Sequence, residues 1–297
     1  MKPGQIARDE WTRLHRSGFG RFLRSLLAGI PWSEHAEEDV VLHLTLPPGG
    51  QTLRLHNANG RTRIVGADRS DIEVRARKKA RAESAEAAKR LLETIRIVAD
   101  EVGDALELEV EVPRKWNRRG YANLEVSVPR SLSLQVSASN GKVAIEGVRA
   151  AVRAHSSNGS VSIVDVIGDI EIGTSNAMVC CSCTRGRLIA RSSNGKIELD
   201  KHCGSVDAST SNGLIRATLE EVSKGGIQLA TSNGRIVLEL PDEVDADVDI
   251  RVDNGVIRND RLLCQCFRET PGQIRGRLGS GGPLIKLRTS NGVIALR

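Results

Sequence analysis

A short phrase built around Ser-Asn-Gly, followed by alternating apolar residues, returns at regular intervals along most of the chain. Its asparagines are Asn140, Asn158, Asn176, Asn194, Asn212, Asn233, Asn254 and Asn291. The first four steps between them are 18 residues each, the next two are 21 and the last is 37. A constant period of this length is typical of repeat architectures, in which each repeat packs mainly on its neighbours.

Each period contains two segments in which apolar and polar residues alternate. The first follows the Asn, as in Val161 and Ile163, and the second comes later in the period, as in Ile170 and Ile172. Alternation with period two predicts half-buried strands. The Asn-Gly pair predicts one corner between the strands and a second glycine, such as Gly168, predicts the other, because both residue types tolerate positive φ.

Two architectures fit this order of strands and corners. In an antiparallel meander, each Asn-Gly would form a two-residue hairpin turn. In a β-solenoid, each period is one coil, and equivalent residues stack about 4.8 Å apart as parallel strands. Stacked coils must keep one perimeter, and the repeated step of 18 residues matches that constraint. We therefore predict an all-β fold, a single-stranded β-solenoid (β-helix) with coils of about 18 residues.

The solenoid domain is expected over residues 39–297, with an early, imperfect coil around Asn59 and two insertions. Residues 83–94 are rich in Ala, Glu and Leu and predict a helix. Residues 259–280 interrupt the last period and predict a surface loop. Lys and Arg gather near residues 75–81, but aromatic residues make up only 2 % of the chain and no reader motif accompanies the charge. Nucleic acid is therefore not an expected partner.

Residues 1–38 form a distinct basic segment that predicts an amphipathic helix. The residues of its candidate membrane or partner face are Phe19, Arg21, Phe22, Leu23, Arg24, Leu26 and Leu27. Three roles remain open: a helix packed on the solenoid, an anchor on an anionic membrane surface, or a partner-binding helix. The sequence shows no signal peptide or transmembrane segment. We expect a cytoplasmic protein, with peripheral attachment to the inner membrane as the alternative.

Candidate chemistry is sparse. Acidic residues are scattered along strands and turns, so we expect no catalytic residues and no cofactor. Cys180 and Cys183 lie one predicted coil away from His202 and Cys203, and thiolate and imidazole groups are the ligands of zinc sites. The alternative is that cysteines fill the repeat positions as small apolar residues, as Cys181 does at an inward position. We expect this second interpretation to hold, with reduced thiols and no metal.

The ladder of Asn-Gly turns, the inserted helix and the closing phrase GSGGPLIKLRTSNGVIALR together resemble the bacterial putative-adhesin family of β-solenoid domains of unknown function. The resemblance covers about residues 40–297. It implies the solenoid fold and a role outside the cell, although the sequence carries no export signal. The residues that carry it are turn and core residues, so it implies no chemistry.

Three functional hypotheses follow. The first is a non-catalytic scaffold that presents a long face to a protein partner or self-associates through its C-terminal coil. This coil would have an open edge because the phrase TSNGVIALR runs to Arg297 without a cap. The second is a peripheral membrane or envelope component held by the N-terminal helix. The third, from another class, is a Cys/His metal-binding protein or an enzyme.

Overall fold

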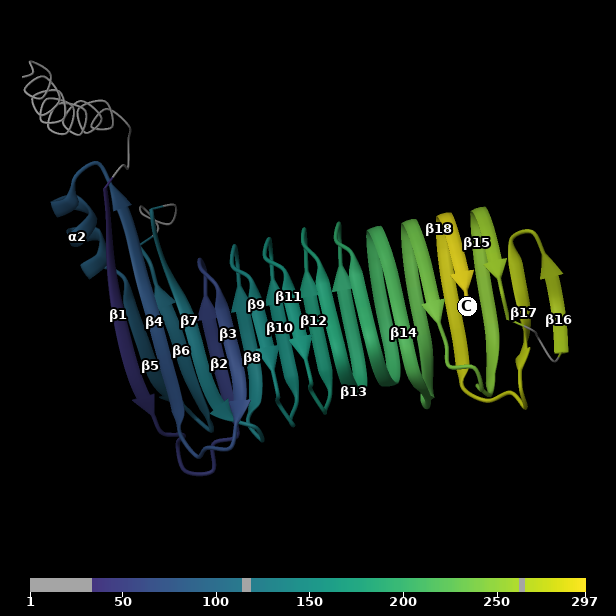
Figure 1. The fold of residues 1–297 in the computed structure, drawn as a ribbon, viewed down its shortest axis with the longest axis horizontal. Coiled ribbons are helices and arrows are strands. Elements are labelled where there is room, and N and C mark those ends of the chain that lie inside the picture. The colour runs from purple at the N-terminus through teal and green to yellow at the C-terminus, as the bar shows by residue number, and fades with distance from the viewer. Residues whose placement is uncertain (1–33, 114–118, 262–264) are drawn as a thin grey trace, which may run out of the picture.

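The computed structural model describes residues 34–113, 119–261 and 265–297. In these residues the chain winds into an elongated stack of β-coils (Figure 1). The strands, in chain order, are β1 (Glu34–Leu44), β2 (Thr52–Asn57), β3 (Thr62–Ala67), β4 (Ile72–Ala82), β5 (Arg96–Val102), β6 (Ala105–Glu111), β7 (Gly120–Pro129), β8 (Ser133–Ala138), β9 (Val143–Glu146), β10 (Val152–Ser156), β11 (Val161–Val164), β12 (Ile170–Thr174), β13 (Val179–Ser192), β14 (Ile197–Glu239), β15 (Ala246–Asn259), β16 (Gln265–Thr270), β17 (Gln273–Leu278) and β18 (Leu284–Leu296). A helix, α2 (Ala85–Glu93), follows β4.

Successive coils pair in parallel, which confirms the solenoid and excludes the meander. Residues one period apart are partners: Val152 lies opposite Ile170, and Val161 lies opposite both Val143 and Val179. The pairings form two rows. Face A contains β5, β6, β2, β8, β10, β12, the later part of β13 and one segment from each following coil, and ends with β17 and β16. Face B contains β1, β4, β7, β3, β9, β11 and the other segment of each coil.

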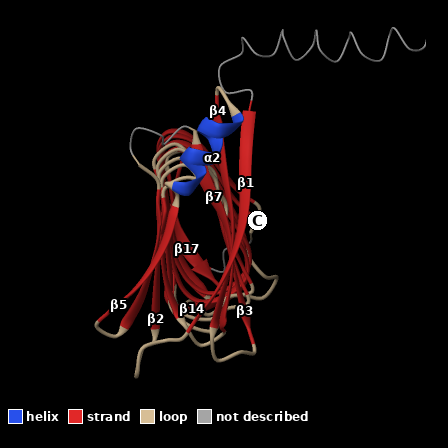
Figure 2. Ribbon diagram, turned by 90° about the vertical axis from the view of Figure 1, so that its left-hand side faces the viewer, coloured by secondary structure: helices blue, strands red, loops and turns tan. Residues whose placement is uncertain are grey.

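The two faces lie opposite each other across a narrow interior (Figure 2). Aliphatic side chains fill this interior. The predicted inward residues lie in it, and Val161, Ile163, Ile170 and Ile172 are all buried. Burial of apolar surface at about 25 cal/mol per Å² is the main source of stability in such a core. Among the described residues, no aromatic side chain is buried in this core, and small aliphatic side chains allow the two faces to lie close together.

The asparagines of the repeated phrase form one continuous column at a corner, which we call the Asn ladder. Each Nδ2 donates to the Oδ1 of the Asn in the next coil over 2.8–3.2 Å. In spatial order the ladder is Asn59, Asn140, Asn158, Asn176, Asn194, Asn212, Asn233, Asn291 and Asn254. Asn59 belongs to the early coil that its Asn-Gly pair predicted.

At one end of the stack, the chain order and the spatial order differ. The coil made by β2 and β3 lies between the strands β6 and β7 on one side and β8 and β9 on the other. Beyond it, β4 pairs antiparallel with β7, and β1 with β4. Helix α2, capped by Ser84, packs on this end and buries Ala88, Leu91 and Leu92. The helix predicted over residues 83–94 is therefore found, and it covers the end of the core.

At the other end, the expectation that the C-terminal coil is the open edge is wrong. Strand β18 lies between β14 and β15 and pairs with both, as Figure 1 shows by the yellow strand between two green ones. Backbone bonds link Arg297 to Leu238 and Leu240, so the last residue also belongs to an interior coil. The outermost full coil is β15. The first part of β18, residues 284–289, pairs with β14 on one side and with β15 on the other. This pairing brings the end of the chain back into the stack.

The insertion predicted as a surface loop over residues 259–280 is instead largely a hairpin. Strand β17 pairs antiparallel with the first half of β15, and β16 pairs with β17, so the hairpin extends face A beyond the last coil. The helix expected within residues 1–38 falls mostly outside the described residues, although β1 already begins at Glu34. Within the described ranges, no helix has the length and apolar character needed to span a membrane.

Candidate functional site

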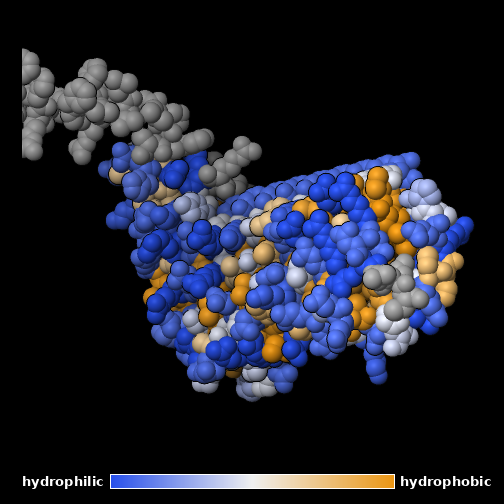
Figure 3. All heavy atoms as spheres, turned by 45° about the vertical axis from the view of Figure 1, so that its right-hand side comes forward, coloured by the Kyte–Doolittle hydropathy of each residue, from blue (hydrophilic) through white to orange (hydrophobic). Residues whose placement is uncertain are grey.

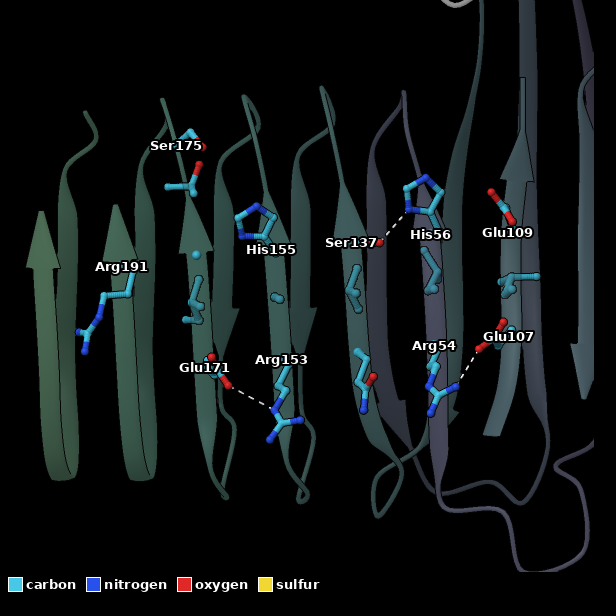
Figure 4. Close-up of a pocket in the computed structure, with 18 of the residues that line it drawn as sticks. Arg54, His56, Glu107, Glu109, Ser137, Arg153, His155, Glu171, Ser175 and Arg191 are labelled. Atoms are coloured by element: carbon cyan, nitrogen blue, oxygen red, sulfur yellow. Dashed lines mark hydrogen bonds and ion pairs between the residues drawn. The ribbon is translucent and has the colours of Figure 1, made fainter. Parts of the chain in front are cut away.

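A groove of about 760 Å³ crosses the outer surface of face A, centred on β8. We call it the β8 groove. Its polar lining includes Arg54, His56, Glu107, Glu109, Gln135, Ser137, Arg153, His155, Glu171 and Arg191. These residues alternate with inward core residues on the same strands, because successive side chains of a strand point to opposite faces. The parallel register then stacks them in two rows that run along the solenoid (Figure 4).

The first row is Glu107, Arg54, Gln135, Arg153 and Glu171, in the order fixed by the strand register. At each end an arginine pairs with a carboxylate: Arg54 with Glu107 over 2.8 Å and Arg153 with Glu171 over 3.2 Å. Both pairs are partly exposed and are therefore worth little for stability. Gln135 lies between the two guanidinium groups, and the row is arranged symmetrically about it.

The second row places a histidine on each side of Ser137, with His56 on one neighbouring strand and His155 on the other. The Nδ1 atom of His56 lies 2.8 Å from the Ser137 hydroxyl. Around β8, two arginines and two imidazoles therefore surround a side-chain amide and a hydroxyl. This arrangement provides hydrogen-bond donors on both sides of a central position, as recognition of a carboxylate requires.

Gly173 continues the second row and makes room for His155. A Cβ atom built on Gly173 would lie 2.7 Å from Nδ1 of His155, so the imidazole occupies the space of the missing side chain. The backbone there is an ordinary strand in β12, and the glycine is needed for space rather than for its φ angle. The absence of a side chain on this strand fixes where the imidazole lies.

The four residues considered for a zinc site are not brought together. Thr184 lies opposite His202, and Arg185 lies opposite Cys203, so Cys180 and Cys183 belong to other positions of the register. Within residues 34–113, 119–261 and 265–297, no group of three His, Cys, Asp or Glu residues is arranged to hold a metal ion. Cys181 is fully buried in the core, as its inward position predicted, and burial raises the pKa of its thiol.

His202 is buried at a corner between coils. Its Nδ1 lies 2.9 Å from the Thr184 hydroxyl, whereas Nε2 has no hydrogen-bond partner. Burial lowers the pKa of His202 below its ordinary value of 6.5, because the interior disfavours the charged imidazolium. The nearby thiol of Cys203 lies 3.4 Å from Glu220 instead, and burial also raises the pKa of this thiol. These groups are separate buried features and do not form one reactive centre.

The β8 groove was not predicted from the sequence, although part of its signal is present there. Gln135, Arg153 and Glu171 are spaced by 18 residues, and Ser137 and His155 repeat the same step. A search for chemistry at the outward positions of consecutive repeats would have found these rows. The remaining part, from β2 and β6, comes from coils whose neighbours cannot be read from the sequence period.

The chain is similar to one known family and to several solved structures. A family model described as Toastrack DUF4097 matches residues 51–297. Among solved structures, one from Bacteroides fragilis described as a putative adhesin shares 14 % identity at a TM-score of 0.47, covering 89 % of this chain and 98 % of that chain. Another, a putative adhesin from Parabacteroides merdae, shares 10 % identity at a TM-score of 0.36, covering 89 % and 96 %. No curated protein matches the chain.

Proposed function

The chain belongs to the Toastrack DUF4097 family, as its repeated phrases suggested, and from this premise we propose that it is a non-catalytic interaction scaffold that binds a protein partner in the β8 groove. The observation that carries the proposal is the symmetric set of donors about Gln135 and Ser137, on strands held rigidly in register. A rigid surface loses little conformational entropy on binding, which favours recognition of a partner.

The two arginines that flank β8 favour one carboxylate of the partner at that position, while the carboxylates elsewhere in the lining, Asp100, Glu107, Glu109 and Glu171, disfavour a longer acidic segment. A carboxylate over β8 would receive hydrogen bonds from Arg54 and Arg153, each of which is already oriented by its own glutamate. Such preorganised guanidinium groups bind carboxylates in a fixed geometry. Glu107 and Glu171 at the two ends would repel further acidic residues and so limit how the segment lies along the row.

The test is site-specific photo-crosslinking in the native cell. A photoreactive residue at Gln135 should capture one discrete protein, whereas the same residue at Ser162, which lies on face B, should not. Once identified, the purified partner should bind the intact chain, and Arg153→Glu should weaken binding about 10-fold or more because a repulsive charge replaces a donor. Lys224→Glu, outside the groove, is the matched charge change and should leave the affinity unaltered.

Two results would overturn the proposal. One is equal capture from Gln135 and Ser162, which would show that the groove is no more a contact surface than the opposite face. The other is a partner whose affinity does not respond to Arg153→Glu. Circular dichroism of each variant separates loss of binding from loss of folding, and Arg153 is an exposed residue whose replacement should leave the fold intact.

A further inference from the structure

The end of the solenoid at β15 is uneven, because the two faces stop at different levels. On face A, β17 and β16 continue beyond β15. On face B, no strand among the described residues pairs with the outer side of residues 253–259. Two strand spacings of about 4.8 Å make this a step roughly 10 Å deep. Figure 1 shows the hairpin projecting beyond the last coil.

The hairpin is fixed to the coil beneath it by charged side chains. Arg275 lies 3.2 Å from Asp249, and Arg277 lies 3.0 Å from Asp247. Asp249 is nearly buried, and the guanidinium of Arg275 holds the pKa of its carboxyl below the ordinary value. The step is therefore a built feature of the molecule rather than a loose flap.

Both edges of the step offer unpaired backbone groups and exposed apolar side chains. All six residues of β16 are exposed, and no described strand pairs with its outer edge. Phe267 is 62 % exposed and Val256 is 52 % exposed. Figure 3, which brings this end forward, shows hydrophobic residues in orange among the hydrophilic ones. Open strand edges of this kind invite pairing with another chain.

We propose that two copies of this chain join at this end as an interlocking dimer, in which β16 of each copy fills the step beside β15 of the other. A two-fold axis parallel to the strands inverts the stack and exchanges the faces. The hairpin of the second copy then occupies the two missing positions on face B of the first. The same operation fills the step of the second copy, so the contact is closed and self-complementary.

The strand directions and the side chains agree with this arrangement. Because β16 is antiparallel to β17, and β17 to β15, β16 runs in the direction of the first half of β15. The second half of β15 returns on face B in the opposite direction, so β16 meets it antiparallel. Arg277 lies 5.7 Å from the Phe267 ring, which places this ring on the outer surface. Phe267 and the partner's Val256 would then lie on neighbouring strands of one surface.

A second copy is favoured over a filament because the two ends of the stack differ. At the far end, β1, β4 and helix α2 cover the core, so no matching step is present in the described residues. The outer edges of β1 and β5 lie at that end, but face B extends only one strand beyond face A there, so these edges do not complement a step of two strands. The dimer does not depend on the proposed groove partner, because the β8 groove and this step involve different coils.

The test is the mass of the intact chain in solution, measured by sedimentation velocity over a range of concentrations. The expected species at high concentration is twice the chain mass of 32.1 kDa. Val256→Lys should shift the equilibrium to the monomer by about 10-fold or more, because a charged side chain would replace the apolar cross-strand contact with Phe267 at both symmetric positions of the dimer. Val164→Lys, also exposed on face B but in the middle of the stack, should remain dimeric.

A covalent measurement tests the geometry separately. In a chain whose native cysteines, including the exposed Cys183 and Cys266, are replaced by Ser or Ala, oxidation of the Val256→Cys, Phe267→Cys double variant should link two copies, whereas the Val164→Cys, Phe267→Cys variant should not. A strictly monomeric intact chain would overturn the proposal. So would a dimer unaffected by Val256→Lys and not linked by the double variant, since both results together would place the contact elsewhere. A thermal midpoint unchanged by Val256→Lys in dilute solution would show that the variant folds.

Discussion

His202 is a histidine held neutral by its surroundings, with one ring nitrogen near Thr184 and the other without a partner. Because burial lowers the pKa of His202 below 6.5, the unfolded chain binds the proton more readily than the folded one. The contribution of neutral His202 to the free energy of unfolding is therefore fully present above about pH 6.5 and declines as the pH falls below that value. We expect the melting temperature to drop as the pH falls below about 6.5.

The variant that tests this source of pH dependence is His202→Gln. It removes the titrating group, so the decline of the melting temperature on acidification should become shallower, even if the variant is less stable at neutral pH. His155→Gln is the matched control, because His155 is exposed in the β8 groove. Equal pH slopes in the native chain and His202→Gln would contradict the prediction.

The Asn ladder links neighbouring coils through side-chain amides. Asn194 donates to Asn176 and accepts from Asn212, both over 3.0 Å. Asn194→Ala breaks both bonds and should lower the free energy of unfolding by about 1–2 kcal/mol, since each bond contributes about 1 kcal/mol net. Asn254 ends the ladder with a bond to Asn291, and Asn254→Ala should cost less.

Urea denaturation measures these two costs. Ser193→Ala is the control for Asn194→Ala, because Ser193 is exposed beside the ladder and its hydroxyl is not part of the Asn column. A ladder that matters should give a clear loss for Asn194→Ala and little change for Ser193→Ala. Equal losses would assign the effect to the corner as a whole rather than to the amide column.

The corner glycines set how closely coils approach at the element scale. A Cβ atom added to Gly159 would lie 1.8 Å from the carbonyl oxygen of Gly141, which cannot move without distorting its own coil. Gly159→Ala should therefore destabilise the protein by about 1–3 kcal/mol through overpacking. Thermal denaturation measures the loss, and Ala177→Gly, at the same position of the next coil, is the comparison that should change stability least.

The sequence predicts the elements well where a repeat is regular. The third and fifth positions after each Asn are inward, as Val161 and Ile163 show, because a strand alternates its faces. The inserted helix is also readable, since its composition differs from that of the strands. The hairpin of β16 and β17 cannot be predicted in this way, because its residues do not follow the repeat. The pairing of β17 with β15 is visible only in the three-dimensional structure.

At the scale of the whole molecule, the order of coils along the chain is not their order in space. The coil of β2 and β3, and the coil of β18, both insert between coils that are distant in sequence. Their inward residues follow the same alternation as every other coil, so the pattern cannot show which neighbours they have. This ambiguity explains why the β8 groove, which spans β6, β2 and β8, was only partly readable from the sequence.

This difference in order predicts which coil is most sensitive to mutation. Ile294 is the third residue after Asn291 and lies close to the end of the chain. It is fully buried between two coils, whereas Ile257 is only partly buried in the outermost coil. Ile294→Ala should cost about 2–5 kcal/mol, because it leaves a cavity that neither neighbour can fill. Ile257→Ala should cost less, since the open end already exposes part of the side chain.

Both substitutions are best made together with Val256→Lys, which removes the proposed dimer and leaves the edge of β15 open. Denaturant unfolding then compares the two positions within one monomeric molecule. If stability followed distance from the chain terminus, Ile294→Ala would fray the end of the chain at little cost and Ile257→Ala would be the more damaging change. The structure requires the opposite order, because β18 holds β14 and β15 together and its loss would detach the last coil with its hairpin.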